Sequence, residues 1–365
     1  MKRILHVVGA RPNFMKIAPV MWAVAAYPAE FEQLLVHTGQ HYDFKMSQVF
    51  FDELSLPQPD VNLDVGSGSH AWQTAQVMQR FEPVVLDFKP DWVIVPGDVN
   101  STLACALVSS KLGIAVAHVE AGLRSFDRTM PEEINRVLTD HLADALFTTE
   151  ADAGENLMHE GIAPAKVHFV GNVMIDSLVS LLPKAEARWK VLCERLGCDR
   201  YVLVTLHRPS NVDRPEVLRE FIVALADIAC HTPVIFPVHP RTRQRIADAG
   251  LRIDAAHLHL EEPLSYLDFL ALEAHASVVV TDSGGVQEET TFLGVPCLTA
   301  RPNTERPVTI THGTNRLVAS QSSVLISAIQ DSLNGDWRRG QAPDQRPMLW
   351  DGGAAERIAA ILRVL

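Results

Sequence analysis

The fold of this chain follows from a pattern that first appears at residues 2–12, which read KRILHVVGARP. Residues 2–8 are mostly apolar and are typical of a buried strand, and the segment Gly9–Pro12 is typical of a tight turn. Residues 14–27 then have the residue types and spacing of a helix. Strand, turn and helix together predict one βα unit.

The same unit repeats along the chain in two series. In the first series we predict strands at 31–37, 92–96, 115–119 and 145–149, and helices at 43–54, 70–88, 101–112, 132–143 and 151–160. Residues 173–196 are helical in composition with no strand among them, so they connect this series to the next. In the second series we predict strands at 201–205, 233–237, 258–261, 277–281 and 295–299, and helices at 215–230, 240–249, 265–274 and 285–293. A terminal helix follows at 354–365. This alternation predicts an α/β fold with two Rossmann-like domains, each built on a parallel sheet.

Composition excludes several classes of protein. A chain of 365 residues exceeds what one hydrophobic core usually organises, which also favours two domains. The net charge of −12 argues against general binding to nucleic acid or to an anionic membrane, and the longest apolar runs have the length of strands rather than of membrane spans. The five cysteines form no CxxC pair, which predicts free thiols in a reducing, cytoplasmic compartment.

Polar residues gather where the predicted strands end. In an open parallel sheet, ligands bind at the carboxyl ends of the strands, so these positions are the candidates for function. They are Arg11, Asp98, Glu120, His207, His239 and the pair Asp282–Ser283. Because both halves place reactive groups on the same kind of edge, we expect the two sheets to face each other across a cleft that holds a small molecule.

The segment Ser283–Gly285 comes between a strand and a helix. Backbone N–H groups and the helix dipole can hold an oxyanion there, although an ordinary helix capped by Ser283 or Asp282 has the same sequence. Glu289 can reach a ribose diol from the first turns of this helix or can be a solvated helical side chain. Arg11 and Lys16 can contact a diphosphate or can simply be exposed on the first turn of their helix.

Four carboxylates follow the strand ends and the helix start of the first half: Asp98, Glu120, Glu132 and Glu133. Neighbouring carboxylates raise the pKa of one of them into the range that suits general acid and base catalysis. The alternatives are helix capping by Asp98 and interaction of the two glutamates with a helix dipole. We find no GxGxxG after a strand, no P-loop, and no HExxH, paired CxxC or DxD motif. We therefore expect neither a cofactor nor a bound metal.

Ten motifs in order resemble those of the non-hydrolysing UDP-N-acetylglucosamine 2-epimerases over residues 1–330. In the first half they are Gly9–Pro12 with Lys16, Thr38–His41, Pro96–Asp98, His118–Arg124 and Pro131–Arg136. In the second half they are Gly171–Asp176, Thr205–Arg208, His239–Arg241, Thr281–Glu289 and Thr304–Pro307. The chain differs from bacterial members of this family that have a second, activating UDP-GlcNAc site: four residues separate His41 from Met46, where those members often have three, which argues against allosteric activation. The segment between Arg124 and Pro131, which borders the expected sugar pocket, is also short.

The resemblance implies a glycosyltransferase-B-like fold with three parts. These are an N-terminal domain (1–171) with the acid and base carboxylates, a C-terminal domain (172–351) that binds UDP, and a helix (352–365) that returns to the first domain. It assigns catalysis to Asp98, Glu120, Glu132, Arg136 and His207. It assigns UDP binding to Arg11, Lys16, His207, Ser283, Gly284, Gly285, Glu289 and Arg306.

The implied reaction is the reversible C2 epimerisation of UDP-GlcNAc to UDP-ManNAc, through 2-acetamidoglucal and bound UDP, for the synthesis of cell-surface polysaccharide precursors. The resemblance also implies a homodimer. Alternatives are an epimerase of a UDP-2,3-diacetamido sugar or uronic acid, a glycosyltransferase of the same fold, a hydrolysing epimerase and a nucleotide-sugar sensor without activity.

Overall fold

The computed structural model describes residues 1–39, 57–251, 257–335 and 346–365. The chain forms two compact units. The first contains residues 1–180 and 348–365, and the second contains residues 181–347.

The first unit is built on a seven-stranded sheet in which every neighbouring pair of strands is parallel. In spatial order its strands are β3 (Val61–Asn62), β2 (Phe31–His37), β1 (Lys2–Val8), β4 (Trp92–Pro96), β5 (Ala115–Ala121), β6 (Ala145–Thr148) and β7 (Val167–Phe169). The central strands β1 and β4 are almost wholly buried, which agrees with their continuous apolar sequence.

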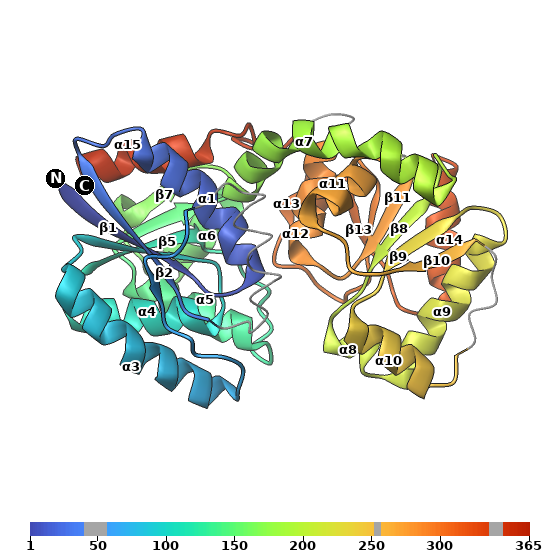
Figure 1. The fold of residues 1–365 in the computed structure, drawn as a ribbon, viewed down its shortest axis with the longest axis horizontal. Helices are drawn as coiled ribbons and strands as arrows, with labels where there is room; N and C mark the ends of the chain where they lie inside the picture. The colour runs from blue at the N-terminus through green and yellow to red at the C-terminus, as the bar shows by residue number, and fades with distance from the viewer. Residues whose placement is uncertain (40–56, 252–256, 336–345) are drawn as a thin grey trace. The chain divides into compact units, whose positions relative to one another are not determined.

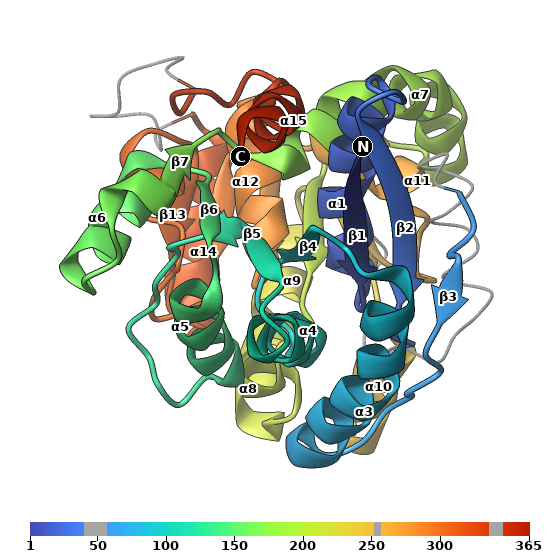
Figure 2. The ribbon, with the colours of Figure 1, turned by 90° about the vertical axis from the view of Figure 1, so that its left-hand side faces the viewer.

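Helices cover both faces of this sheet, as Figures 1 and 2 show, with α1 and α15 on one face and α3, α4 and α5 on the other. The helices are α1 (Arg11–Ala25), α3 (His70–Phe88), α4 (Asn100–Lys111), α5 (Pro131–Leu142), α6 (Ala151–His159), the short 3₁₀ helix η1 (Pro164–Lys166), the start of α7 (Val173–Leu196) and α15 (Ala354–Val364). Helix α3 illustrates why these segments fold as they do. The Ser69 side chain caps its N-terminus by accepting from Trp72 N, and a stripe at helical spacing (Val77, Phe81, Val85) is fully buried against the sheet.

Helix α15 belongs to the first unit although it follows the second in sequence. It packs against α1, and the Asp176 carboxylate accepts hydrogen bonds from Ala354 N (3.2 Å) and Ala355 N (2.6 Å) at its first turn. The Lys2 ammonium donates to Leu362 O at the other end of the helix (3.0 Å). Figure 1 accordingly shows the two chain ends side by side.

The second unit repeats the architecture with a six-stranded parallel sheet. In spatial order its strands are β10 (Leu258–Glu261), β9 (Val234–Pro237), β8 (Val202–Thr205), β11 (Val278–Thr281), β12 (Cys297–Thr299) and β13 (Asn315–Leu317). Its helices after α7 are α8 (Pro209–Val212), α9 (Pro215–Ala229), α10 (Pro240–Asp248), α11 (Tyr266–His275), α12 (Gly284–Leu293), α13 (Val308–Thr311) and α14 (Ser322–Leu333). Its core joins β8, β9 and β11 to α9 and α14, which pack against each other.

The α/β fold class and the two parallel sheets predicted from the sequence are confirmed. Most predicted elements within the described ranges are present with ends that agree within one or two residues. Sequence reasoning missed the short strands β3, β7 and β13, the helix α14 and the short helices η1, α8 and α13. The helix predicted at 43–54 lies outside the described residues. In the part of the chain that the structure describes, no helix combines the length and hydrophobicity that crossing a membrane would need.

Candidate active site at the strand ends

Lys16 and Glu120 form a buried ion pair at the carboxyl edge of the first sheet. Lys16 comes from the second turn of α1 and Glu120 from the end of β5, and both side chains are less than 10% exposed. Gly97, after β4, lies against both of them, since a Cβ atom built on it would be 2.8 Å from Lys16 Nζ and 3.3 Å from Glu120 Oε2. Three separate strand and helix ends therefore meet around one carboxylate. Lys16 is therefore buried, and the alternative that it is simply exposed on its helix is wrong.

The backbone of Glu120 is strained. Its φ of +71° lies in the left-handed region, and the pairing of β5 with β6 shifts register between Val119 and Ala121. A residue with a side chain pays about 1–2 kcal/mol for this conformation. Such strain and such bulges concentrate where a side chain is re-aimed at a functional site.

Asp98 follows Gly97 and is held by α5. Arg136 Nη2 lies 2.5 Å from Asp98 Oδ2, and Arg136 Nη1 lies 2.9 Å from Glu133 Oε2. The Asp98 carbonyl accepts from Asn135 Nδ2 (2.9 Å). Asp98 does not cap α4, whose N-cap position is Val99. Its side chain is 27% exposed, so this carboxylate is both fixed by a guanidinium and open to solvent.

Glu132 and Glu133 have different surroundings although they are adjacent on the first turn of α5. Glu133 is buried and accepts from Ser125 N (2.9 Å), Ser125 Oγ (2.8 Å) and Phe126 N (2.8 Å), which fixes the loop before the helix. Glu132 is exposed. The structure thus groups Asp98 with Arg136 and Glu120 with Lys16, and it shows Glu132 in contact with neither pair among the described interactions.

In the second unit, His207 follows β8 and pairs with Asp282, which follows the adjacent strand β11. His207 Nδ1 lies 2.9 Å from Asp282 Oδ1, and the imidazole is 56% exposed. Asp282 also accepts from His207 N, Arg208 N and Asn211 Nδ2. Burial opposes its ionised form, but hydrogen bonds from His207 and Asn211 hold the pKa of Asp282 below its usual value. A buried carboxylate therefore orients a solvent-facing imidazole, an arrangement suited to binding an anion or moving a proton.

The N-terminus of α12 lies on the same edge. Ser283 is its N-cap residue, and its side chain makes no capping hydrogen bond. Gly284 allows Arg306 to approach the helix, since a Cβ there would be 2.5 Å from Arg306 Nη1. Arg306 is buried and pairs with Glu305 (2.5 Å) and Glu288 (2.8 Å). Gly285 is the second residue of the helix. Unused backbone donors of a first helical turn next to an arginine can bind phosphate oxygens.

Glu289 is buried, so the alternative that it is a solvated helical side chain is wrong. It is buried on α12 and accepts a hydrogen bond from Tyr266 Oη of α11 (2.8 Å). Burial raises the pKa of Glu289 to about 7, against the opposing hydrogen bonds from Tyr266 and Glu273. Glu273 is also fully buried, and burial beside Glu289 raises its pKa well above the usual value. Sequence reasoning missed Tyr266 and Glu273, because nothing in the sequence relates α11 to α12 at this point.

Two further predictions concern residues that the structure describes in part or not at all. Arg11 is the first residue of α1, but its side chain is outside the described part of the chain. Gln40, His41 and Met46, which carry the departure from the family motif, also lie outside the described residues.

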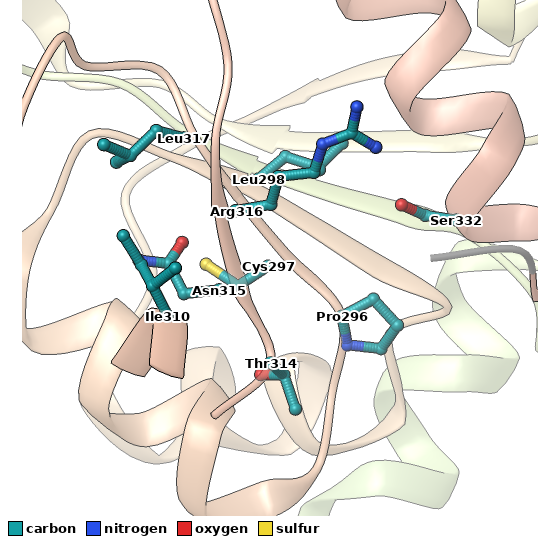
Figure 3. A pocket seen from close by; sticks show the side chains of 9 residues that line it. All are labelled: Pro296, Cys297, Leu298, Ile310, Thr314, Asn315, Arg316, Leu317 and Ser332. Carbon is teal, nitrogen blue, oxygen red and sulfur yellow. The ribbon is translucent and has the colours of Figure 1, made fainter. Parts of the chain in front are cut away.

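A cavity of about 250 Å³ lies beside β12 and β13 in the second unit (Figure 3), and none of the predicted site residues lines it. Its wall is mainly apolar and includes Leu298, Ile310 and Leu317. Among the described residues there is no group of three or more His, Cys, Asp or Glu side chains placed to hold a metal ion. The candidate site therefore consists of the strand ends described above.

Comparison with known proteins relates these strand ends to a family. Residues 25–363 match the family model described as UDP-N-acetylglucosamine 2-epimerase. A UDP-N-acetylglucosamine 2-epimerase of Methanocaldococcus jannaschii is 43% identical over 364 residues, which cover 98% of this chain and 97% of that protein. A UDP-2,3-diacetamido-2,3-dideoxy-D-glucuronate 2-epimerase of Pseudomonas aeruginosa is 40% identical over 367 residues, which cover 100% of this chain and 100% of that protein. The crystal structure of the M. jannaschii enzyme in complex with UDP-GlcNAc and UDP superposes with a TM-score of 0.90 at 42% identity, covering 100% of both chains.

Proposed function

This chain belongs to the UDP-N-acetylglucosamine 2-epimerase family, and we propose that it interconverts UDP-GlcNAc and UDP-ManNAc by eliminating and re-adding UDP. It is thus an isomerase of nucleotide sugars with a glycosyltransferase-B-like fold, in which each of the two units is Rossmann-like. The observation that carries the proposal is the pair of fixed carboxylates at one sheet edge, Asp98 on Arg136 and Glu120 on Lys16. A glycosyltransferase of this fold needs a diphosphate site and an acceptor site, but it does not need two carboxylates fixed in this way.

The chemistry explains why two kinds of group are required. The C2 hydrogen of the sugar is scarcely acidic, because no carbonyl group is adjacent to stabilise a carbanion. If a base removes this proton while the C1–O bond breaks, the C–H electron pair forms the C1=C2 double bond of 2-acetamidoglucal, and the C1–O pair leaves with UDP. Negative charge then develops on the diphosphate, where cations and helix N–H groups stabilise it. Delivery of a proton to the opposite face of C2 and attack of the UDP oxygen on C1 complete the epimerisation.

We assign the proton transfers to the first unit. Asp98 and Glu120 are the carboxylates at the sheet edge, and Arg136 orients Asp98. Lys16 compensates the charge of Glu120. Glu132, which the family motif also assigns to catalysis, is exposed on the first turn of α5, where a substrate can reach it.

We assign UDP binding to the second unit. Ser283, Gly284 and Gly285 offer the α12 N-terminus to the diphosphate, with His207 and Arg306 as the nearby cationic or proton-donating groups. Arg11 adds a further cation from the first unit. The buried Glu289 accepts hydrogen bonds from the ribose hydroxyls.

The wider setting is also a proposal. All five cysteines are free thiols, which suits a reducing compartment, and we place the enzyme in the cytoplasm. We further propose that it acts as a homodimer and supplies precursors for cell-surface polysaccharides.

Incubation with UDP-GlcNAc in D₂O, without metal or acceptor, tests the proposed reaction. We expect NMR to show deuterium at C2 of a UDP-GlcNAc and UDP-ManNAc mixture. Unlabelled starting material alone would reject this substrate, and label only in free sugar would indicate a hydrolysing enzyme. A parallel incubation with a UDP-2,3-diacetamido uronic acid decides the substituents at C3 and C6. Asp98→Asn and Glu120→Gln should abolish the exchange while UDP still binds.

A further inference from the structure

His118 is a buried histidine of β5 that the proposed mechanism does not use. Its side chain is fully buried two residues before Glu120. His118 Nε2 lies 2.7 Å from the carbonyl oxygen of Gly97, and His118 Nδ1 lies 2.6 Å from Asp140 Oδ1 on α5. The imidazole therefore links α5 to the turn that carries Asp98.

Both partners of this imidazole are hydrogen-bond acceptors. A backbone carbonyl can only accept, so Nε2 must carry a proton. Asp140 accepts in addition from Arg124 Nη1 (2.7 Å) and from Gly122 N (3.2 Å). Burial opposes ionisation of Asp140, but His118 and Arg124 hold the pKa of this carboxyl below its usual value. Asp140 thereby fixes the ring from the α5 side, with Nε2 directed at the Gly97 carbonyl.

We propose that His118 is a positioning residue that holds the Gly97–Asp98 turn of the active site through the hydrogen bond from its Nε2 to the Gly97 carbonyl. This rests on the proposed function, in which Asp98 acts on the substrate. Other side chains among the described residues donate to the backbone carbonyls on either side of Gly97: Asn13 Nδ2 to Pro96 O (3.2 Å), Thr102 Oγ1 to Pro96 O (2.8 Å) and Asn135 Nδ2 to Asp98 O. Within the same described contacts, the side-chain donor to the Gly97 carbonyl between them is His118.

Another strand of the same sheet provides a matched control. His6 of β1 is also fully buried, but its Nε2 faces Gln33 Oε1 (2.8 Å) and its Nδ1 has no hydrogen-bond partner among the described residues. Burial lowers the pKa of His6 to about 4, so this ring is neutral. The described hydrogen bond of His6 goes to Gln33 and not to the Gly97–Asp98 turn, so His6 controls for the loss of a buried imidazole alone.

NMR of the full-length protein labelled with ¹⁵N-histidine tests which ring nitrogen carries a proton. Replacement of each histidine in turn by phenylalanine assigns the two ring signals. We expect Nε2 of His118 to carry a proton, because the Gly97 carbonyl can only accept a hydrogen bond. A His118 ring without a proton on Nε2 overturns the proposal without any assay of activity.

Deuterium exchange at C2 tests the positioning role. For His118→Phe we expect the turnover number to fall about 10²-fold with little change in the KM for UDP-GlcNAc, because the displaced group acts in the reaction rather than in UDP binding. His6→Phe should keep the turnover of the wild type. A His118→Phe protein with wild-type turnover overturns the positioning role, as does a crystal structure of this variant with an unmoved Gly97–Asp98 turn. If the wild type exchanges no deuterium, the proposed function fails, whereas the NMR and crystallographic results still decide this inference.

Discussion

Replacing Gly97 by alanine should damage the active site far more than the fold. Gly97 has a φ of +64°, which costs an alanine about 1–2 kcal/mol. The new Cβ would also be 2.8 Å from Lys16 Nζ, whereas ordinary contact begins near 3.4 Å, so the ammonium must move by roughly 0.6 Å. Glu120 Oε2 at 3.3 Å must adjust as well.

Gly113 is a matched control for this substitution. It lies in the same unit with a φ of +72°, but a Cβ there would meet nothing within 4 Å. Gly113→Ala and Gly97→Ala therefore share the backbone strain, and only Gly97→Ala moves the ion pair. We expect urea unfolding to show a loss of about 1–2 kcal/mol for each variant.

The two variants should separate in the isotope-exchange assay. A displacement of this size at a catalytic group lowers turnover by about 10- to 100-fold, so Gly97→Ala should show that loss and Gly113→Ala should not. Equal exchange rates in both variants, at equal stability, would refute the reasoning that the contact of Gly97 with Lys16 and Glu120 matters for the reaction.

Three further outcomes follow from the second unit. Glu289→Gln should raise the Kd of UDP in calorimetry at least about tenfold, since a hydrogen bond to a charged group contributes about 1.5–3 kcal/mol, and unchanged affinity would remove Glu289 from the nucleotide site. Burial raises the pKa of Glu289 from 4.5 to about 7, so between these pH values the folded state keeps a proton that the unfolded state has released. The free energy of unfolding should therefore fall by about 3 kcal/mol as the pH rises from 4.5 to 7. In Glu289→Gln this fall should be smaller. Arg306→Met removes the arginine that pairs with the buried Glu288 and Glu305, of which Glu305 keeps its pair with Arg301, and should cost about 3 kcal/mol in urea unfolding. Arg214→Met, in an exposed pair, should leave stability unchanged, and equal effects of the two would contradict the buried role of Arg306.

The sequence predicts the fold well where strands are long and apolar. Trp92–Pro96 is recognisable because five buried residues in a row suit only a strand covered on both faces. The strands β3, β7 and β13 have two or three residues each, and most of those residues are only partly buried, so they show neither an apolar run nor an alternation. Their positions depend on pairing with a neighbour that is distant in sequence.

The candidate site could be predicted as a set of strand ends but not as a set of contacts. Lys16 and Glu120 are 104 positions apart, and their pairing depends on the neighbouring places of β1, β4 and β5 in the sheet. Glu132 and Glu133 are equivalent in the sequence, and only the Ser125 and Phe126 amides show which one turns inward. The left-handed backbone of Glu120 has no sequence signal, because the surrounding residues read as a regular strand.

The place of α15 has a consequence for biosynthesis. Residues 348–365 complete the first unit, yet the ribosome makes them only after every residue of the second. The second unit can therefore reach its native state during translation, before α15 has been made. Until then, the surface of α1 that binds α15 stays uncovered. Lys2 contacts the carbonyl of Leu362, so a short peptide linker can join the two ends of the chain. A circular permutant with its new ends at the exposed turn before α9 would have the first unit as one continuous stretch of sequence. The ribosome would then make that unit without interruption.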